Sequence, residues 1–528
     1  MIHLPKNETK LMVAVHGWSG ILLGLVLYAV ILTGTAAVFA EEIGIWSAGH
    51  VSTNSAFERP IGQTVERLGQ QTPSKYHEGV DLFEVGDHEL GAFFHRHETD
   101  PDGTFVSRGI YYQVDRTGRV IDRQAGTGEE VFGPRNDDAL SHFLVDTHVR
   151  LHIPNPWGLL LTGILGLAML VAAISGLMIH RHLFKDIFTL RRRANPVLFN
   201  RDRHSVAGTW SLPFAFILAF TGSFFSFFGT VGVPIVAMAA FGGDVQALND
   251  TVFGNPGKPD PRPVATSGLD RITSDAIRRT GEIPTFITVE NFGRADAKVT
   301  TFHPPEEGGV VPISLLYAGA DGRFEQVKPL IGAKPSAGGT LAAIMSPLHF
   351  GNFAGLLSKA VWFGLGFAMC YVTLTGLRLW VVRRASEARS LGWLDRLVTI
   401  VGLGLPFALL CTAAAFFLTA SSGQALFWTP AGFLIASAAV ILGGFLMRDR
   451  EKFGLMLEGA TGLLLLGLPL LRLFIDGPGW GEAISAGQPI IAAVDCALLL
   501  AGGWVIARFA SQWTQGQSGQ SAVLEAAE

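Results

Sequence analysis

One residue pattern occurs twice in the chain, each time at the start of a long apolar stretch. The segments 16–34 and 204–222 both begin with a histidine, have a glycine four residues later and end in the dipeptide Thr-Gly. At about 1.5 Å per residue, such a segment covers roughly 27 Å as an α-helix, close to the thickness of the hydrocarbon core of a bilayer. Each copy is therefore expected to span a membrane, with a histidine near one face and a glycine near the other.

The composition of the whole chain indicates a polytopic α-helical membrane protein. Of its 528 residues, 49% are hydrophobic and only 16% are charged, which is too apolar for an ordinary soluble enzyme. The first apolar stretch is longer than the hydrophobic region of a signal peptide, so we expect it to be retained. Eight stretches are expected to cross the bilayer, at residues 13–40, 157–179, 204–240, 356–382, 397–420, 429–447, 454–475 and 488–507.

The charged residues predict the orientation of these helices. Strongly basic connections, such as 181–203 and 383–396, alternate with connections that lack basic residues, such as 421–428 and 476–487. Because basic loops stay in the cytoplasm, both termini are expected inside a bacterial inner membrane and both large polar segments outside it. The expected division is helices one to four at 1–40, 148–182, 204–242 and 346–384, helices five to eight within 397–508, periplasmic α+β domains at 41–147 and 243–345, a cytoplasmic loop at 183–203 and a cytoplasmic tail at 509–528.

The duplication extends beyond the two opening helices. His148 precedes the dipeptide Ser175-Gly176 by nearly the same distance as His349 precedes Thr375-Gly376. Both polar segments also contain a turn sequence between two expected strands, VDRTGRV at 114–120 and GADGRF at 319–324. The predicted core is therefore two copies of helix, outside domain and helix, and helices five to eight are an addition to it.

Histidines near the ends of membrane helices are candidate functional residues. The expected topology places His16, His180, His182 and His204 at the cytoplasmic face and His148, His152 and His349 at the outer face. Two layers of imidazoles in a four-helix core fit two b-type haems with two axial histidines each. A pseudo-two-fold axis between the halves pairs His16 with His204, and His148 with His349. His180 is a rival ligand at the inner site and His152 at the outer site, and a role as interfacial polar residues stays open for all of them.

At these motifs the sequence resembles the PepSY-associated transmembrane proteins, which include ferric-siderophore reductases and iron-regulated membrane proteins. The similar stretches are HGWSG, RHSVAG, THVRLHIPNPWG, PLHFGNFAG and SGLMIHRHLFKDIFTLR, and the resemblance covers roughly residues 8–385. It implies periplasmic PepSY-like domains at about 60–125 and 260–330, haem b, and electron delivery to an outside acceptor. The ligands that it implies are His16, His148, His180, His204 and His349.

Other signals are weaker. The cysteines Cys370, Cys411 and Cys496 lie in apolar stretches without C-x-x-C spacing, which argues against iron–sulfur clusters, structural zinc and disulfides. His88, His95 and His97 could gather a metal, although a solvated loop is favoured. Arg472 and Asp495 are expected to pair structurally, with a headgroup or quinone site as the alternative. Nothing suggests nucleic-acid binding, and no dinucleotide or ATP motif is found.

These features favour a transmembrane haem-dependent ferric reductase. A cytoplasmic reductant or a membrane quinol would supply the electron, and a ferric siderophore or another ferric chelate in the periplasm would accept it. Reduction to ferrous iron weakens binding to hard oxygen ligands and releases the metal. Two alternatives remain: a transporter with proton-relaying histidines, and a PepSY-type module that binds peptides or restrains a protease.

Overall fold

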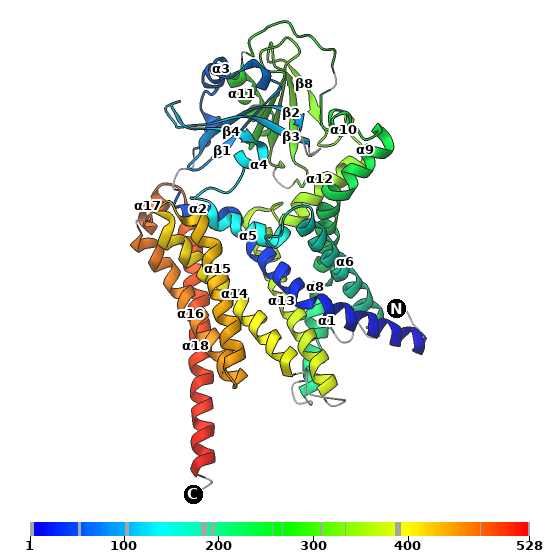
Figure 1. Cartoon of the computed structure of the whole chain (residues 1–528), viewed down its shortest axis with the longest axis vertical. Coiled ribbons are helices and arrows are strands. Elements are labelled where there is room, and N and C mark those ends of the chain that lie inside the picture. Colours follow the sequence, from blue (N-terminus) through cyan, green and yellow to red (C-terminus); the bar gives the residue numbers. More distant parts are fainter. Residues whose placement is uncertain are drawn as a thin grey trace. The chain divides into compact units, whose positions relative to one another are not determined.

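Two compact units make up the chain (Figure 1). The helical unit consists of Met1–Gly49, Pro134–Thr230 and Leu356–Glu528, and the sheet unit consists of His50–Gly133 and Val231–Gly355. The computed structural model describes residues 5–50, 54–100, 105–180, 187–191, 196–255, 257–266, 268–306, 309–332, 334–385, 392–475 and 477–525.

Eight helices among the described residues are long and apolar enough to cross a membrane, which confirms the eight predicted stretches. The chain is therefore a multi-pass membrane protein. The third span runs through α8 (Pro196–Phe227), a π-helical turn (Phe228–Gly232) and α9 (Val233–Phe241). The other seven are α1 (Lys6–Ala37), α6 (Trp157–Ile179), α13 (Gly355–Ala385), α14 (Gly392–Ala420), α15 (Ala425–Leu446), α16 (Arg450–Phe474) and α18 (Pro489–Glu525).

Several predicted boundaries are wrong, because polar residues extend the helices. The sequence places the start of the third helix at His204, but α8 begins at Pro196. Proline is well suited to the start of a helix, where its missing N–H is not needed. At the other end of the chain, α18 continues as helix to Glu525, through most of the predicted tail.

The predicted outside domain at 41–147 is divided between the two units. Its first and last parts form α2 (Ala40–Ala48) and α5 (Ala139–Arg150), which belong to the helical unit. Helix α5 packs on α1 and α2 and ends before the cis Asn155–Pro156 peptide bond that precedes α6. His148 therefore lies on a separate helix, and not on the second membrane span as the sequence predicts.

The centre of the helical unit is an apolar cluster to which all four core helices contribute. Met169 of α6, Phe214 and Ala219 of α8 and Met369 of α13 are buried there, and Leu27 of α1 packs against them. Helix α14 joins this core through α1, where the Tyr28 hydroxyl donates to the carbonyl oxygen of Gly402 over 2.8 Å. Helix α14 is therefore packed onto the duplicated core, and α15 and α18 contact α5 and α2, respectively.

A buried ion pair connects two of the additional helices, α16 and α18. Arg472 of α16 lies 2.5 Å from Asp495 of α18, and their side chains are 2% and 0% exposed. The indole N–H groups of Trp46 and Trp480 also donate to the two Asp495 oxygens, over 2.7 and 2.8 Å. The predicted structural pairing of Arg472 with Asp495 is confirmed.

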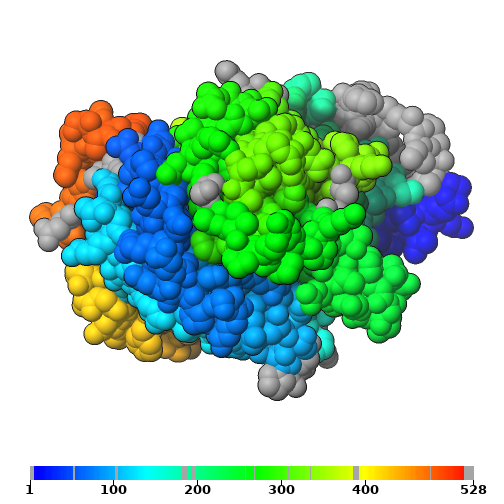
Figure 2. Space-filling view, turned by 90° about the horizontal axis from the view of Figure 1, so that it is seen from above, coloured from blue at the N-terminus to red at the C-terminus, as the bar shows by residue number. Residues whose placement is uncertain are grey.

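The sheet unit contains one antiparallel sheet with the strand order β4-β3-β2-β1-β5-β6-β7-β8. The sequence predicts two separate outside domains, but β1 pairs with β5 and joins both polar segments into a single sheet. In the space-filling view the blue half and the green half of this unit lie against each other (Figure 2). The strands are β1 (Gly79–Val85), β2 (Glu89–Thr99), β3 (Phe105–Val114), β4 (Val120–Thr127), β5 (Phe286–Glu290), β6 (Lys298–His303), β7 (Ile313–Ala318) and β8 (Phe324–Lys328).

The two halves of the sheet repeat one design. Each has four strands and one amphipathic helix, α3 (Gly62–Gln71) or α11 (Leu269–Thr280), whose apolar residues share one core with the strands. The predicted turns at 114–120 and 319–324 connect β3 to β4 and β7 to β8, so both hairpins are confirmed. The remaining helices are η1 (Ala56–Glu58), η2 (Ser74–Tyr76), α4 (Gly128–Val131), α10 (Val245–Val252), α12 (Ala337–Phe350) and, in the helical unit, α17 (Trp480–Ser485).

Candidate functional site

His16 lies on α1 and is held by α6. Its Nδ1 donates to the carbonyl oxygen of Ala172 over 2.9 Å and lies 3.3 Å from the Ser175 hydroxyl. Gly176 leaves room for the ring, because a Cβ at that position would lie 3.2 Å from His16 Cε1. Both the hydrogen bond and the glycine are provided by the neighbouring helix.

His204 has the same surroundings in the second half of the core. From α8, its Nδ1 donates to the carbonyl oxygen of Val372 on α13 over 3.0 Å and lies 3.4 Å from the Thr375 hydroxyl. A Cβ at Gly376 would lie 3.0 Å from His204 Cε1. The duplicated sequence thus produces a duplicated arrangement around each histidine.

These hydrogen bonds determine what the two imidazoles can do. An Nδ1 that faces a carbonyl oxygen must carry the proton, so Nε2 has a free lone pair in the neutral ring. No hydrogen bond to Nε2 of His16 or His204 is found within the part of the chain that the structure describes. The predicted pair is brought together, with ring centres 6.0 Å apart and ring planes at 65°.

This spacing fits a metal ion shared by the two rings. Two imidazole nitrogens that each bind one metal ion at about 2 Å bring their ring centres to roughly 6 Å apart. Among the described residues no group of three or more His, Cys, Asp or Glu side chains gathers at any point. A pair of imidazoles therefore suits a metal that carries its own in-plane ligands, as haem iron does, better than a bare ion that needs four protein ligands.

The helix surface one turn after each histidine of the pair is open. One turn after each histidine on the same helix face stands a glycine, Gly20 or Gly208. A Cβ at Gly20 would meet no atom within 4 Å, and one at Gly208 would meet only Val372, at 3.7 Å. The residues present therefore fit haem at this place.

Comparison with known proteins assigns the family. Residues 13–383 match the family described as the PepSY-associated TM region. The chain belongs to this family. A protein of Pseudomonas aeruginosa whose own name is uncharacterized is 26% identical over 401 residues, which is 70% of this chain and 95% of that protein. The matched region of this PepSY-associated protein contains the duplicated core and ends before α14.

A third histidine of this PepSY-associated protein shows the same arrangement. His148 on α5 donates from Nδ1 to the carbonyl oxygen of Val30 on α1 over 2.9 Å. A Cβ at Gly34 would lie 2.6 Å from His148 Cε1. Burial lowers the pKa of His148, and the hydrogen bond to Val30 opposes that shift. The neutral form of the imidazole, which is the metal-binding form, is thereby favoured.

The rival outer ligand His152 has a different environment. Its Nε2 lies 2.8 Å from the Thr147 hydroxyl and its Nδ1 lies 2.7 Å from an oxygen of Asp146. Burial lowers the pKa of His152, and Asp146 raises it. Both ring nitrogens of His152 are therefore engaged, whereas His148 shares the arrangement of His16 and His204 around Nδ1.

The structure places two further predicted ligands at the C-terminal ends of helices α6 and α12. His180 caps the C-terminal end of α6, and its buried Nδ1 has no hydrogen-bond partner among the described residues. His349 lies in the last turn of α12, in the sheet unit, so its pairing with His148 stays a prediction. His182 lies outside the described residues.

The histidines of the first polar segment form no metal site in the described structure. The favoured solvated loop is also wrong for two of them, because His95 and His97 lie on β2 and His95 is buried. Each histidine has a carboxylate neighbour instead. The pairs are His88 with Glu84 at 2.8 Å, His95 with Asp81 at 3.2 Å and His97 with Glu78 at 2.9 Å.

The sequence interpretation missed the residues that hold the imidazoles. Gly34, Gly176 and Gly376 each leave room for a histidine of another helix, and the sequence did not show which histidine each glycine would serve. The sequence does contain a pattern that marks these positions, because all four core helices carry a Ser-Gly or Thr-Gly dipeptide. The hydroxyl of each dipeptide donates back to a carbonyl oxygen of its own helix, as Thr33 does to Ala29 over 2.8 Å.

Proposed function

We propose that this membrane protein is a haem b-dependent ferric reductase that moves electrons across the bacterial inner membrane to a ferric chelate, such as a siderophore, in the periplasm. The observation that carries the proposal is the anchored pair of His16 and His204, with ring centres 6.0 Å apart. The family assignment supports a membrane protein of the PepSY-associated type but does not itself specify the reaction.

The histidines have defined roles in this proposal. His16 and His204 would hold one haem iron at the inner site, and His148 and His349 would hold a second at the outer site, with His180 as the inner rival. A haem iron held by two imidazoles can accept and release one electron, at a potential that depends on its ligands and surroundings. The carbonyl oxygens of Ala172 and Val372 orient the two inner rings before any ligand binds.

The apolar cluster of the core has a second role. Met169, Phe214 and Ala219 are at most 9% exposed and lie among the same four helices. These side chains keep water out of the space between the helices. A dry surrounding changes the potential of a bound redox group and separates it from side reactions with solvent.

The substrate chemistry explains the release of iron. Ferric iron that gains one electron becomes ferrous iron, which binds hard oxygen ligands less tightly. The electron donor would be a cytoplasmic reductant or a membrane quinol, because the sequence contains no nicotinamide-binding or ATP-binding motif.

Electron transfer across sealed vesicles tests this function. Purified protein is reconstituted with a quinol inside, and a ferric chelate and a ferrous-specific dye outside. We expect ferrous iron to appear only when protein and quinol are both present, and the rate to fall to background for His204→Ala. A colourless protein that moves the labelled chelate inward without reducing it would support the transporter instead and contradict the reductase.

A further inference from the structure

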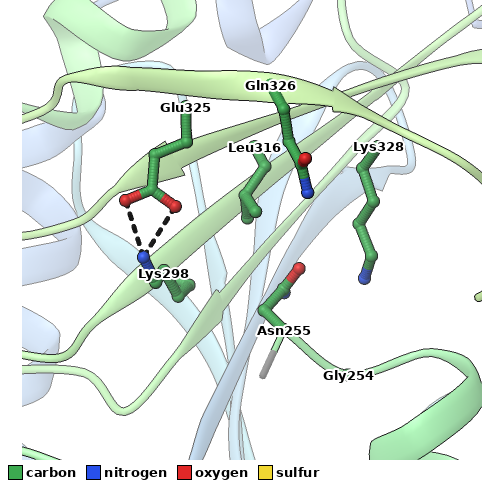
Figure 3. Close-up of a pocket in the computed structure, with 7 residues that line it drawn as sticks. All are labelled: Gly254, Asn255, Lys298, Leu316, Glu325, Gln326 and Lys328. Carbon is green, nitrogen blue, oxygen red and sulfur yellow. Dashed lines mark hydrogen bonds and ion pairs between the residues drawn. The ribbon is translucent and has the colours of Figure 1, made fainter. Parts of the chain in front are cut away.

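The sheet unit has a pocket on the face of the sheet that is opposite α3 and α11. Alternate residues of a strand point to opposite faces, and Val299, Leu315 and Tyr317 belong to the core that α3 and α11 cover. The pocket has a volume of about 210 Å³ and is shown in Figure 3. Its lining residues are Gly254, Asn255, Lys298, Leu316, Glu325, Gln326 and Lys328.

Lys328 is unusual because it is a buried lysine that lines this pocket. The residue is only 9% exposed, and its ammonium group donates to the carbonyl oxygen of Phe253. An ammonium group has three N–H donors. Within the described residues this is its one hydrogen-bond acceptor, and no carboxylate oxygen lies within 4.0 Å of it. Two donors of a buried cation are therefore available to a ligand.

The other charges of the pocket do not satisfy Lys328. Lys298 and Glu325 bind each other on the opposite wall, with both Glu325 oxygens at 2.6 to 2.7 Å from the ammonium group (Figure 3). Glu290 accepts from Asn255 over 2.8 Å, and burial raises the pKa of Glu290. Burial also lowers the pKa of Lys328, and the nearby Glu290 opposes that shift. An anion that approaches Lys328 would supply the missing counter-charge.

The shape of the pocket limits the kind of anion. Figure 3 shows Gln326, Asn255 and Lys328 converging on one side of the space, away from the pair of Lys298 and Glu325. One ammonium and the amide of Gln326 match a carboxylate, which accepts hydrogen bonds at both oxygens. The volume of about 210 Å³ is below the usual range for drug-sized ligands, so the pocket suits a small molecule or one arm of a larger one.

We propose that this pocket binds an organic carboxylate through Lys328 and Gln326. The carboxylate is either that of a free small acid or that of one arm of a ferric chelate. The inference concerns the sheet unit alone and does not depend on haem binding, so it can fail or succeed independently of the proposed reductase.

Equilibrium dialysis of the full chain in detergent tests the proposal, with labelled succinate and labelled citrate as probes and ferric citrate as competitor. We expect saturable binding to the wild-type protein and at least a tenfold loss of affinity for Lys328→Gln. Lys258→Gln removes an equal charge from an exposed position outside the pocket and is expected to bind like the wild type. If ferric citrate displaces the labelled probe at a concentration equal to or below that of unlabelled citrate, the ligand is one arm of a ferric chelate. If ferric citrate does not displace the probe, the ligand is a free acid.

A second variant keeps the test decisive if Lys328→Gln fails to fold. Gln326 is exposed, so Gln326→Glu should leave the fold intact, and it places a negative charge where the carboxylate would bind. We expect this variant also to lose at least tenfold in affinity. Absence of saturable binding to the wild type, or unchanged affinity in the folded variants, would overturn the proposal.

Discussion

Three histidines of the core are held in the same way by a neighbouring helix. His16, His204 and His148 each donate from Nδ1 to a carbonyl oxygen that lies four residues before a glycine. The glycine then leaves room for the ring. The histidines and the glycines could be selected from the sequence by their spacing. The sequence could not show which glycine lies beside which histidine, because that depends on how the helices pack.

The glycine beside His204 can be tested with a matched control on the same helix. A Cβ at Gly376 would lie 3.0 Å from the His204 ring, whereas one at Gly364 would meet no atom within 4 Å. We expect Gly376→Ala to push the imidazole aside at a cost of about 1–3 kcal/mol and to reduce the haem content. Gly364→Ala should change neither. Thermal unfolding and haem content per chain measure both effects, and equal values for the two variants would show that the ring does not need this space.

His97 predicts a pH dependence in the sheet unit. The hydrogen bond that His97 donates to Glu78 raises the pKa of His97 above its ordinary value of 6.5, and the same bond lowers the pKa of Glu78 below 4.5. The His97 contribution is complete below pH 6.5 and is lost as the pH rises through the raised pKa. The Glu78 contribution is complete above pH 4.5 and is lost as the pH falls through the lowered pKa.

The pair therefore stabilises β2 most between pH 4.5 and 6.5. Both side chains are more than one third exposed, so solvent screening limits the effect to about 1 kcal/mol or less. Hydrogen exchange of β2 amides, corrected for intrinsic rates, should be slower at pH 6 than at pH 8 in the wild type. The difference should vanish in His97→Gln. If His97→Gln keeps the full difference in exchange rate between pH 6 and pH 8, the pH effect arises from other groups.

At the scale of elements, helices were easier to predict than their exact ends. All eight spans follow from apolar stretches, because a bilayer demands a long apolar helix. The start of α8 at Pro196 and the separate helices α2 and α5 were missed. Polar residues can continue a helix beyond the membrane, and composition does not show where they stop.

The pairing of α16 with α18 depends on Asp495 and Arg472. Removing one partner leaves the other buried without a counter-charge, so we expect Asp495→Asn to destabilise the protein by about 3–5 kcal/mol. The control is Lys452→Met on α16, which breaks an exposed pair at 3.8 Å and should cost less than about 1 kcal/mol. Unfolding in detergent, followed by tryptophan fluorescence, measures both. Similar losses for the two variants would contradict the structural role of the buried pair.

At the scale of the whole molecule, the duplication was visible in the sequence but its consequence was not. Each polar segment was correctly interpreted as strands with hairpin turns, since those signals are local. The antiparallel pairing of β1 with β5, which joins the segments into one eight-stranded sheet, links residues far apart in the chain. The edge strand of a sheet needs a partner, but the sequences of β1 and β5 do not specify which strand each one pairs with.

The proposed function rests on imidazoles that bind haem iron in the membrane core. The most direct measurement is the haem content per chain, taken with an optical spectrum of the reduced protein, after expression with ample haem precursor. We expect two b-type haems in the wild type, loss of one in His204→Ala, and no loss in His152→Ala, whose ring nitrogens already contact Thr147 and Asp146. A wild-type protein that contains no haem under these conditions, or a His204→Ala variant that retains the full content, would contradict the account.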